Sequence, residues 1–402
     1  MTFEDANLLI ISDRYPHEND TISSSFVKSQ VDCLSGYFKR IYVISLTPIV
    51  PKCLSSFSFM NPRWQRDAFA YDYEYYNVKV YFAKHFALPF DFSRKKRGDV
   101  AFRVVDKIIQ DEKIDFSYIH AHFAYPSGYV GAKLKEKYNK KLIITGHGHD
   151  IYHMPFKSPE WNAKIKKALD TSDHIITPSK SIYDKLMQLG VSTEKVSVIS
   201  NGYDSALFNR HPMESSRSEL GLPIDKAVIL SVGNLEPEKG HRYLIEAINI
   251  ISKRRKDIIC VIVGAGSKEK ELRKLLSRLD LSKYVKLVGP KPHDEISMWM
   301  NACDVFVLPS ISESFGIVQI EAMACGKPVV GTRNGGSEEI IINDKLGILV
   351  EPKDPVALAQ AILQALGIEW DAEYIREHAQ QFTWDKIAER IVEVYGEVFE
   401  EH

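Results

Sequence analysis

The chain reads VFVLPSISESFGIVQIEAMACGKPVVG from Val305 to Gly331. The apolar run Val305–Leu308 predicts a buried strand, and a turn containing Gly316 leads into a helical pattern over 316–325. A second apolar run, Pro328–Gly331, follows the helix directly, which is the βαβ order of a parallel sheet. Free amides in a first helical turn and the positive end of the helix dipole favour anions, so this turn predicts a phosphate site.

The same alternation of short apolar runs and longer amphipathic stretches extends over the rest of the chain. Before residue 205, strands are predicted at 7–11, 40–46, 116–121, 141–145, 174–177 and 196–199, with helices at 26–36, 98–112, 127–138, 159–171 and 180–189. After it, strands are predicted at 227–232, 258–263, 285–288, 305–308, 328–331 and 348–350, with helices at 241–255, 268–279, 293–302, 316–325 and 355–366. The fold class is therefore α/β, with two doubly wound Rossmann-like domains facing across a cleft.

The expected domains are residues 1–205 and residues 206–383, and the final helix, 384–402, is expected to pack back on the first domain. The polar stretch 209–217 carries a proline and is interpreted as the linker between them. A third strand and glycine turn, Val263-Gly264-Ala-Gly266, is weak evidence for a dinucleotide.

Composition excludes several classes of protein. The 402 residues carry 52 Lys and Arg against 53 Asp and Glu and are 45% hydrophobic, which is neither disordered nor strongly basic. Residues 1–205 hold 28 basic and 23 acidic residues, a balance of +5, and the remainder balances at −6. No signal peptide or membrane span is visible. The five cysteines fit no zinc or disulfide spacing, so we expect reduced core residues in a cytoplasmic protein.

Charged residues near two glycine turns are candidate site residues. Glu313 precedes the helix after 305–308 and Glu321 lies within it, where carboxylates suit sugar hydroxyls better than phosphates. Lys239 lies in the turn Gly233–Gly240, where a point charge suits a phosphate oxygen. The alternative for the two glutamates is a surface role in capping the helix, and a lone lysine in such a turn is weak evidence.

Histidines cluster at the carboxyl ends of two predicted strands. His120 and His122 end one strand, and His147, His149 and Asp150 follow the next. His120 is expected to face the core, and the His122 side chain to reach the cleft between the domains. A metal site and ordinary structural histidines are the alternatives.

Residues 57–92 hold 13 aromatic residues and do not fit the alternation. A long loop of this kind is often functional. It is interpreted either as a hydrophobic cluster that covers the sheet or as a lid for an acceptor or a membrane surface.

Taken together, these segments resemble the retaining family-4 glycosyltransferases of the GT-B fold. The resemblance runs from Phe26-Val-Lys-Ser-Gln30 through Ile199-Ser-Asn-Gly-Tyr-Asp204 and Gly233–Gly240 to Gly335-Gly-Ser-Glu-Glu339. Its most specific part is Glu313, seven intervening residues, and Glu321 followed by Ala-Met-Ala-Cys-Gly-Lys-Pro-Val-Val.

The resemblance implies a role for each matching residue. Glu313 contacts the donor sugar, Glu321 the ribose and His122 the sugar near its reacting carbon. Lys239 and the amides of Gly316, Ile317 and Val318 hold the diphosphate. The loop with Ser24 and Ser25 lies on the acceptor side, where Asp150 is also assigned. No metal or cofactor is implied beyond the UDP- or GDP-sugar substrate.

Two positions depart from the family pattern. Asn234 stands where an arginine is usual and supplies a hydrogen bond but no charge, for which Arg242 is a candidate substitute. Losing such a charged contact costs about 1.5–3 kcal/mol. Ser24-Ser25 replaces a pair of glycines that allow close backbone approach.

The expected activity is therefore metal-independent transfer of a hexosyl unit to a glycan or lipid-linked acceptor, with retention. A nucleotide-sugar-binding module with little activity and a nucleotide-sugar 2-epimerase are the alternatives. The basic first half and the aromatic segment favour peripheral contact with the inner membrane face, and no nucleic-acid partner is expected.

Overall fold

In the computed structural model, residues 2–20, 24–49, 69–88 and 90–399 are described, and they form two compact units. Unit 1 comprises residues up to Ser200 together with the chain from Trp384 onward, and unit 2 is Asn201–Thr383. The division falls after Ser200 rather than at 205, because the Tyr203 N–H donates to the Phe382 carbonyl and so ties this segment to unit 2.

Unit 1 is built on a sheet of eight strands in the order β3-β4-β2-β1-β5-β6-β7-β8. Its strands are β1 (Phe3–Ser12), β2 (Phe38–Ile49), β3 (Tyr73–Tyr75), β4 (Val78–Phe86), β5 (Tyr118–His122), β6 (Lys141–Thr145), β7 (His174–Thr177) and β8 (Val196–Val198). Every neighbouring pair is parallel except β3 and β4.

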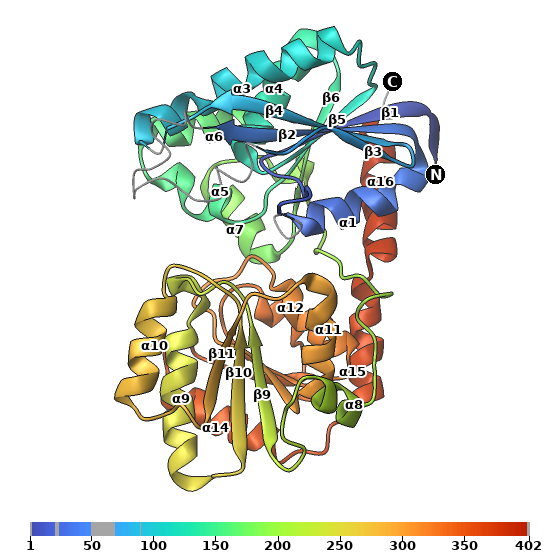
Figure 1. Cartoon of the computed structure of the whole chain (residues 1–402). Coiled ribbons are helices and arrows are strands. Elements are labelled where there is room, and N and C mark those ends of the chain that lie inside the picture. The colour runs from blue at the N-terminus through green and yellow to red at the C-terminus, as the bar shows by residue number, and fades with distance from the viewer. Residues whose placement is uncertain (1, 21–23, 50–68, 89, 400–402) are drawn as a thin grey trace. The chain divides into compact units, whose positions relative to one another are not determined.

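Helices cover both faces of this sheet (Figure 1). The helices are α1 (Ser25–Leu34), α3 (Asp91–Asp111), α4 (Tyr129–Tyr138), α5 (His149–Tyr152), α6 (Pro159–Thr171), α7 (Lys180–Gln188) and α16 (Trp384–Phe399). One core lies under α3, α4 and α6, and the other lies between the sheet, α1 and α16. The final helix packs against the first unit because its apolar face, which includes Ile391 and Tyr395, completes that second core.

Part of the aromatic segment forms strands rather than a loop. Tyr73–Tyr75 and Val78–Phe86 make an antiparallel hairpin whose second strand joins β2. Its aromatic and β-branched side chains pack in the two cores, which is what a half-buried pleated surface favours. Residues 57–68 of the segment lie outside the described residues.

Unit 2 has a sheet of six strands in the order β11-β10-β9-β12-β13-β14, all parallel. The strands are β9 (Ala227–Val232), β10 (Ile258–Val263), β11 (Val285–Gly289), β12 (Val305–Leu308), β13 (Val329–Thr332) and β14 (Gly347–Val350). The helices are α8 (Met213–Glu219), α9 (His241–Arg254), α10 (Glu269–Arg278), α11 (His293–Ala302), α12 (Ile317–Ala324), α13 (Ser337–Ile340), α14 (Pro355–Ala365) and α15 (Ala372–Ala379). Helices α9, α10 and α14 cover one face, and α11, α12 and α15 the other (Figure 1).

The interpretation of 209–217 as the linker between the domains is wrong, because the segment lies within unit 2. This segment enters α8, and the Arg217 side chain is buried, where it forms an ion pair with Asp304 at 2.7 Å. The guanidinium also donates to the carbonyls of Ala302, Ile224 and Lys226. A charge buried with this many partners anchors the segment to unit 2.

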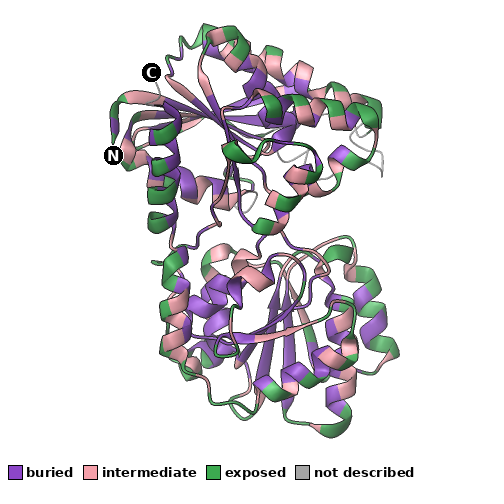
Figure 2. Ribbon diagram, turned by 180° about the vertical axis from the view of Figure 1, so that it is seen from behind, coloured by how far each residue is buried: buried purple, intermediate pink, exposed green. Residues whose placement is uncertain are grey.

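The central strands of both sheets are buried, edge strands such as β3 and β8 are only partly covered, and the outer faces of the helices are exposed (Figure 2). Cys260, Cys303 and Cys325 are buried as expected, whereas Cys33 is only half-buried. Cys53 lies outside the described residues. No helix in the described part of the chain is long and apolar enough to cross a membrane.

Candidate functional site

The candidate site of unit 2 lies where its strand order reverses. Strands β10 and β11 lie on one side of β9 in the sheet, and β12, β13 and β14 lie on the other side. The loops after β9 and β12 diverge at this point, which in open α/β sheets is where ligands bind.

These two loops touch each other closely. Gly240 has a φ of +65°, and a Cβ there would stand 1.9 Å from the Pro309 carbonyl oxygen, so only glycine fits. The Ile311 N–H donates to the Glu238 carbonyl at 2.7 Å. Residues on the two loops are therefore held side by side, although more than 70 positions separate Lys239 from Glu313 in the sequence.

Lys239 and Glu313, both predicted site residues, form an ion pair across this junction. Lys239 Nζ donates to Glu313 Oε1 at 2.5 Å, and Ser310 Oγ donates to the same oxygen at 2.8 Å. The Glu313 side chain is 8% exposed and that of Lys239 is 29% exposed. An ammonium group that remains reachable beside a fixed carboxylate offers a donor for phosphate oxygens and an acceptor for hydroxyl groups.

The first turn of α12 begins beside this pair. Gly316 caps the helix with a φ of +92°, and a Cβ there would stand 2.5 Å from Gln319 Nε2. The N–H groups of Ile317 and Val318 belong to the first turn, where a helix supplies no carbonyl partner. The structure therefore brings Lys239, Glu313 and the helix N-terminus together, as the sequence predicts for an anion site.

Asn334, which the sequence analysis did not single out, braces this site from the loop after β13. Its backbone carbonyl accepts from the Glu313 N–H at 3.1 Å, and its side-chain oxygen accepts from the N–H groups of Gly336 and Ser337. The side chain is buried. An asparagine between a strand end and a pair of glycines is the signal that could have identified it.

Glu321 lies deeper, within α12, and its partner is another residue that the sequence analysis missed. His293 Nε2 lies 2.9 Å from Glu321 Oε1, and the His293 ring packs 5.1 Å from the ring of Phe208. Burial lowers the pKa of His293, but the hydrogen bond and charge of Glu321 raise it more, with smaller contributions from Asp204 and Asp294, so the net pKa lies above 6.5. His293 opens α11 just beyond a strand, which places it at the same sheet edge.

The departure at Asn234 leaves an exposed, uncharged side chain at the start of the β9 loop. Arg242, the expected substitute, instead pairs with Glu246 one turn further along α9 at 3.0 Å. The loop is braced from another side, because the Glu236 carboxylate accepts from the N–H and hydroxyl of Ser267. Among the described residues, Lys239 is thus the cation that contacts Glu313.

Unit 1 reverses its strand order between β1 and β5, and there His122 ends β5. Its side chain is fully buried. The expected reach of His122 toward the cleft between the domains stays a prediction. His122 Nδ1 shares a hydrogen bond with His147 Nε2 at 3.0 Å. Burial lowers the pKa of His122 to about 3, so the ring is neutral at physiological pH.

The outer nitrogens of this pair, His122 Nε2 and His147 Nδ1, have no hydrogen-bond partner among the described residues. His120, by contrast, is bonded at both nitrogens, to Tyr395 of α16 and to Thr145. It faces the core as expected. Within residues 2–20, 24–49, 69–88 and 90–399, no group of three His, Cys, Asp or Glu residues is placed to hold a metal ion.

The Asp150 side chain joins two loops of unit 1 through backbone hydrogen bonds. Its carboxylate accepts from the Ala124 N–H at 2.6 Å, the Gly148 N–H at 2.9 Å and the His147 N–H at 3.2 Å. The side chain is buried, which raises the pKa of the carboxyl, while these N–H groups lower it in part. The acceptor contact assigned to Asp150 stays a prediction.

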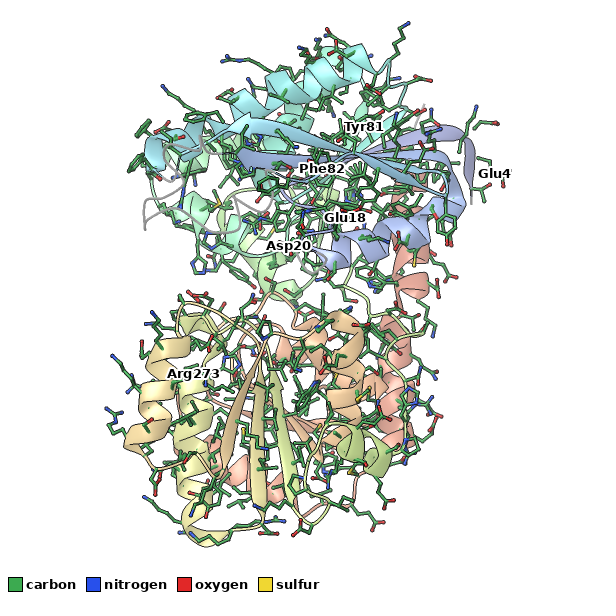
Figure 3. The ribbon with its side chains drawn as sticks, in the orientation of Figure 1. Glu4, Glu18, Asp20, Tyr81, Phe82 and Arg273 are labelled. Atoms are coloured by element: carbon green, nitrogen blue, oxygen red, sulfur yellow. The ribbon has the colours of Figure 1, made fainter. Side chains whose placement is uncertain are left out.

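Ser24 and Ser25 begin α1, and Ser24 has a left-handed backbone with a φ of +56°. Residues 21–23 lie outside the described residues. A small pocket lies among residues of β2, β4 and the segment after β1, and Figure 3 labels two of its lining residues, Asp20 and Phe82. Its other lining residues are Asp13, Arg14, Tyr15, His17, Ser45, Leu46 and Thr47.

Comparisons with known proteins identify the family. The sequence model of glycosyl transferases group 1 matches residues 212–382, and that of glycosyltransferase family 4 matches residues 63–207. An uncharacterised glycosyltransferase of Methanocaldococcus jannaschii is 32% identical over 333 residues, which cover 81% of this chain and 86% of that protein. The chain belongs to the group 1 glycosyltransferases.

Other proteins agree with this assignment. This glycosyltransferase is 30% identical over 307 residues to the D-inositol 3-phosphate glycosyltransferase of Corynebacterium efficiens, with 71% of this chain and 72% of that protein covered. Sucrose-phosphate synthase of Thermosynechococcus elongatus shares the fold, with a TM-score of 0.78 at 22% identity, covering 99% of this chain and 100% of that chain.

The Anabaena protein HepE, solved with UDP and glucose, gives a TM-score of 0.75 at 23% identity, with 96% and 99% of the two chains covered. These likenesses confirm the α/β fold with two Rossmann-like units that the resemblance implied, which is the GT-B fold.

Proposed function

We propose that this glycosyltransferase moves a hexosyl unit from a UDP- or GDP-sugar to a glycan or lipid-linked acceptor, with retention at the anomeric carbon. The observation that carries the proposal is the Lys239–Glu313 pair beside the N-terminus of α12. HepE, which shares the fold, has been solved with UDP and with UDP-glucose, and this supports a nucleotide-sugar donor.

In the proposed reaction the bond from the anomeric carbon to the diphosphate oxygen breaks, and the bonding electrons leave with the diphosphate. Negative charge grows on that oxygen in the transition state. Lys239 and the amides of Gly316, Ile317 and Val318 stabilise this charge more than that of the intact donor, which lowers the barrier. The same cation and amides make a metal ion unnecessary for charge neutralisation.

Retention follows from a front-side route. The acceptor hydroxyl bonds to the oxocarbenium-like carbon on the face that the diphosphate leaves, and its proton passes to a diphosphate oxygen. Glu313 accepts from sugar hydroxyls, Glu321 from the ribose, and Asn234 hydrogen-bonds the donor. The role assigned to His122, a contact with the donor sugar, stays a prediction, as does the acceptor role of Ser24 and Ser25.

The acceptor is the least constrained part of the proposal. The name of the relatives called D-inositol 3-phosphate glycosyltransferase suggests a third class of acceptor, a cyclitol phosphate, besides a glycan and a lipid-linked acceptor. Peripheral contact with the inner membrane face is proposed only for the case in which the acceptor is lipid-linked. Soluble recovery without liposome binding at low salt contradicts that contact.

The first experiment is thermal stabilisation of the wild type by UDP and GDP, beside Glu321→Ala. We expect one nucleotide to raise the melting temperature of the wild type and to lose most of that effect in the variant. The stabilising nucleotide then names the donors for a transfer assay, in which NMR of the anomeric proton reads retention or inversion. Stabilisation by neither nucleotide contradicts the donor site.

Two outcomes of the transfer assay support other functions. Donor binding without turnover over many acceptors favours a binding module, for which the uncharged Asn234 is the motivating residue. Conversion of the donor sugar without any acceptor favours a 2-epimerase.

A further inference from the structure

His293 stands out because it is a titratable side chain bonded directly to a residue of the proposed donor site. The His293 side chain is 40% exposed, whereas that of Glu321 is 5% exposed. The contact joins the first residue of α11 to the middle of α12. Nothing in the reaction proposed above uses this histidine.

The His293 ring is held on two sides. Phe208, which is 1% exposed, packs at 5.1 Å between ring centroids, and Glu321 Oε1 accepts or shares the proton of Nε2 at 2.9 Å. A ring with both a packing partner and a hydrogen bond keeps one orientation. The carboxylate it bonds is therefore fixed as well, since free rotation of Glu321 would break the contact.

Because His293 fixes one oxygen of the Glu321 carboxylate, the other oxygen has a defined position in which to accept a hydrogen bond. A carboxylate accepts several hydrogen bonds, so the bond from His293 leaves Oε2 and further lone pairs of Oε1 available. A ribose presents two neighbouring hydroxyls, and each can donate to one oxygen of such a carboxylate. A 2′-deoxyribose lacks one of these donors, and an oriented charged acceptor penalises that loss more than a mobile one.

We propose that His293 is a positioning residue that sets the preference of the nucleotide site for ribose over 2′-deoxyribose, by holding Glu321 in the orientation that receives both hydroxyls. The inference rests on the proposed function, in which Glu321 binds the ribose. It extends that function from the binding of a nucleotide to the choice of its sugar.

The charges that face His293 fit this role. Besides Glu321, two carboxylates raise the pKa of His293 through their negative charge. They belong to Asp204, in the segment that leads to Phe208, and to Asp294, the residue after His293 in α11. All three are acidic, so they keep the ring a hydrogen-bond donor toward Glu321. A neutral donor of similar reach, such as glutamine, should keep much of the orientation, and alanine should keep none.

The test compares UDP and 2′-deoxy-UDP, or the guanine pair if GDP is the stabilising nucleotide. Calorimetry should give the wild type a preference for the ribonucleotide of about tenfold or more, because a hydrogen bond to a charged group contributes ~1.5–3 kcal/mol. In His293→Ala the preference should fall to about threefold or less, mainly through weaker binding of UDP. His293→Gln should restore most of it.

His378→Ala is the matched control. His378 is also half-buried, bonded through Nε2 to the Ile340 carbonyl at 2.8 Å and packed 5.6 Å from the Phe382 ring, but it does not contact Glu321. Its loss should leave the preference unchanged. Pyrophosphate, which has no ribose, should bind the wild type and His293→Ala equally.

The possible negative results of the binding experiment contradict different proposals. If no ribonucleotide binds the wild type, the proposed function fails. If UDP binds but His293→Ala keeps the wild-type preference, or binds UDP more tightly, the positioning role is wrong. Should His293→Ala not fold, His293→Gln and Glu321→Gln decide, because only the second is expected to abolish the preference. In a working transfer assay, His293→Ala should raise KM for the donor with little change in kcat.

Discussion

The two units place different chemistry at the same topological position. In unit 2 the reversal of strand order carries the Lys239–Glu313 ion pair and the start of α12. In unit 1 it carries the buried His122, its half-buried partner His147, and the start of α1. Both histidines are neutral, because their surroundings lower the pKa of each. The doubly wound fold thus supplies the location, and the residues on the loops decide whether the position is charged or neutral.

The pair of helix starts sharpens the comparison. Both α12 and α1 begin after a residue with a left-handed backbone, Gly316 in unit 2 and Ser24 in unit 1. Glycine adopts this conformation without strain, and serine does not. In unit 2 a Cβ at this position would also stand 2.5 Å from Gln319 Nε2, so glycine is needed there for packing as well as for its backbone conformation.

Removing the charge in unit 2 should have the largest effect. Lys239→Met should lower kcat/KM for transfer by about 10²–10³-fold, the usual loss for one donor to a developing oxyanion. Lys268→Met removes an exposed cation paired with Glu271 in the same unit and should change the rate less than twofold. Equal rates for Lys239→Met and the wild type would contradict the charge-stabilising role.

Adding a Cβ at the start of α12 should have the next largest effect. Gly316→Ala combines a φ of +92° with a Cβ 2.5 Å from Gln319 Nε2, so we expect a loss of ~2–3 kcal/mol in unfolding free energy. Urea unfolding measures it. Gly367→Ala, whose nearest neighbour is 3.5 Å away, is the control and should change stability by less than ~1 kcal/mol.

Acid should weaken the fold at His122 of unit 1. The folded-state pKa of His122 is about 3 against 6.5 unfolded, so its contribution to stability is complete above pH 6.5 and is lost as pH falls toward 3. At pH 5 that loss is ~2 kcal/mol. Urea unfolding at pH 5 and 7.5 should show a smaller difference for His122→Gln than for the wild type. The exposed His153→Gln should match the wild type.

The His293–Glu321 pair of unit 2 should show the opposite pH dependence, and a weaker one. Since the pKa of His293 is raised above 6.5, its ion pair with Glu321 stabilises fully below pH 6.5 and is lost as pH rises through the raised value. Because the histidine is 40% exposed, we expect less than ~1 kcal/mol. The difference in unfolding free energy between the wild type and His293→Gln should decrease as the pH is raised from 5.5 to 8.5. An increase would mean that the ring enters the pair neutral.

The smallest effect is expected at Ser24. Ser24→Gly removes the strain of a left-handed serine but adds chain entropy to the unfolded state, so the net gain in stability is ~0.5 kcal/mol. Thermal unfolding can resolve this against Ser25→Gly, which changes the first residue of α1 and should destabilise by less than ~1 kcal/mol. If Ser24→Gly also destabilises, the serine side chain has a role that its backbone does not explain.

Much of the fold was predictable because its signals are local. Apolar runs such as Val305–Leu308 and Ile258–Val263 appear as strands with the expected bounds. The predictions failed where local patterns are ambiguous. The aromatic stretch does not reveal the hairpin over Tyr73–Phe86, and the serines and proline around helix α8 favour a linker.

The sequence by itself determined the βαβ alternation, the glycine turns and the family, because strand and helix periodicity and short motifs depend on neighbours along the chain. It also placed Lys239, Glu313 and Gly316 at strand ends. Only the tertiary structure decided the pairs: Lys239 with Glu313, His293 with Glu321 and His122 with His147. Strand order and burial bring such partners together across long stretches of sequence, and neither can be read from one segment alone.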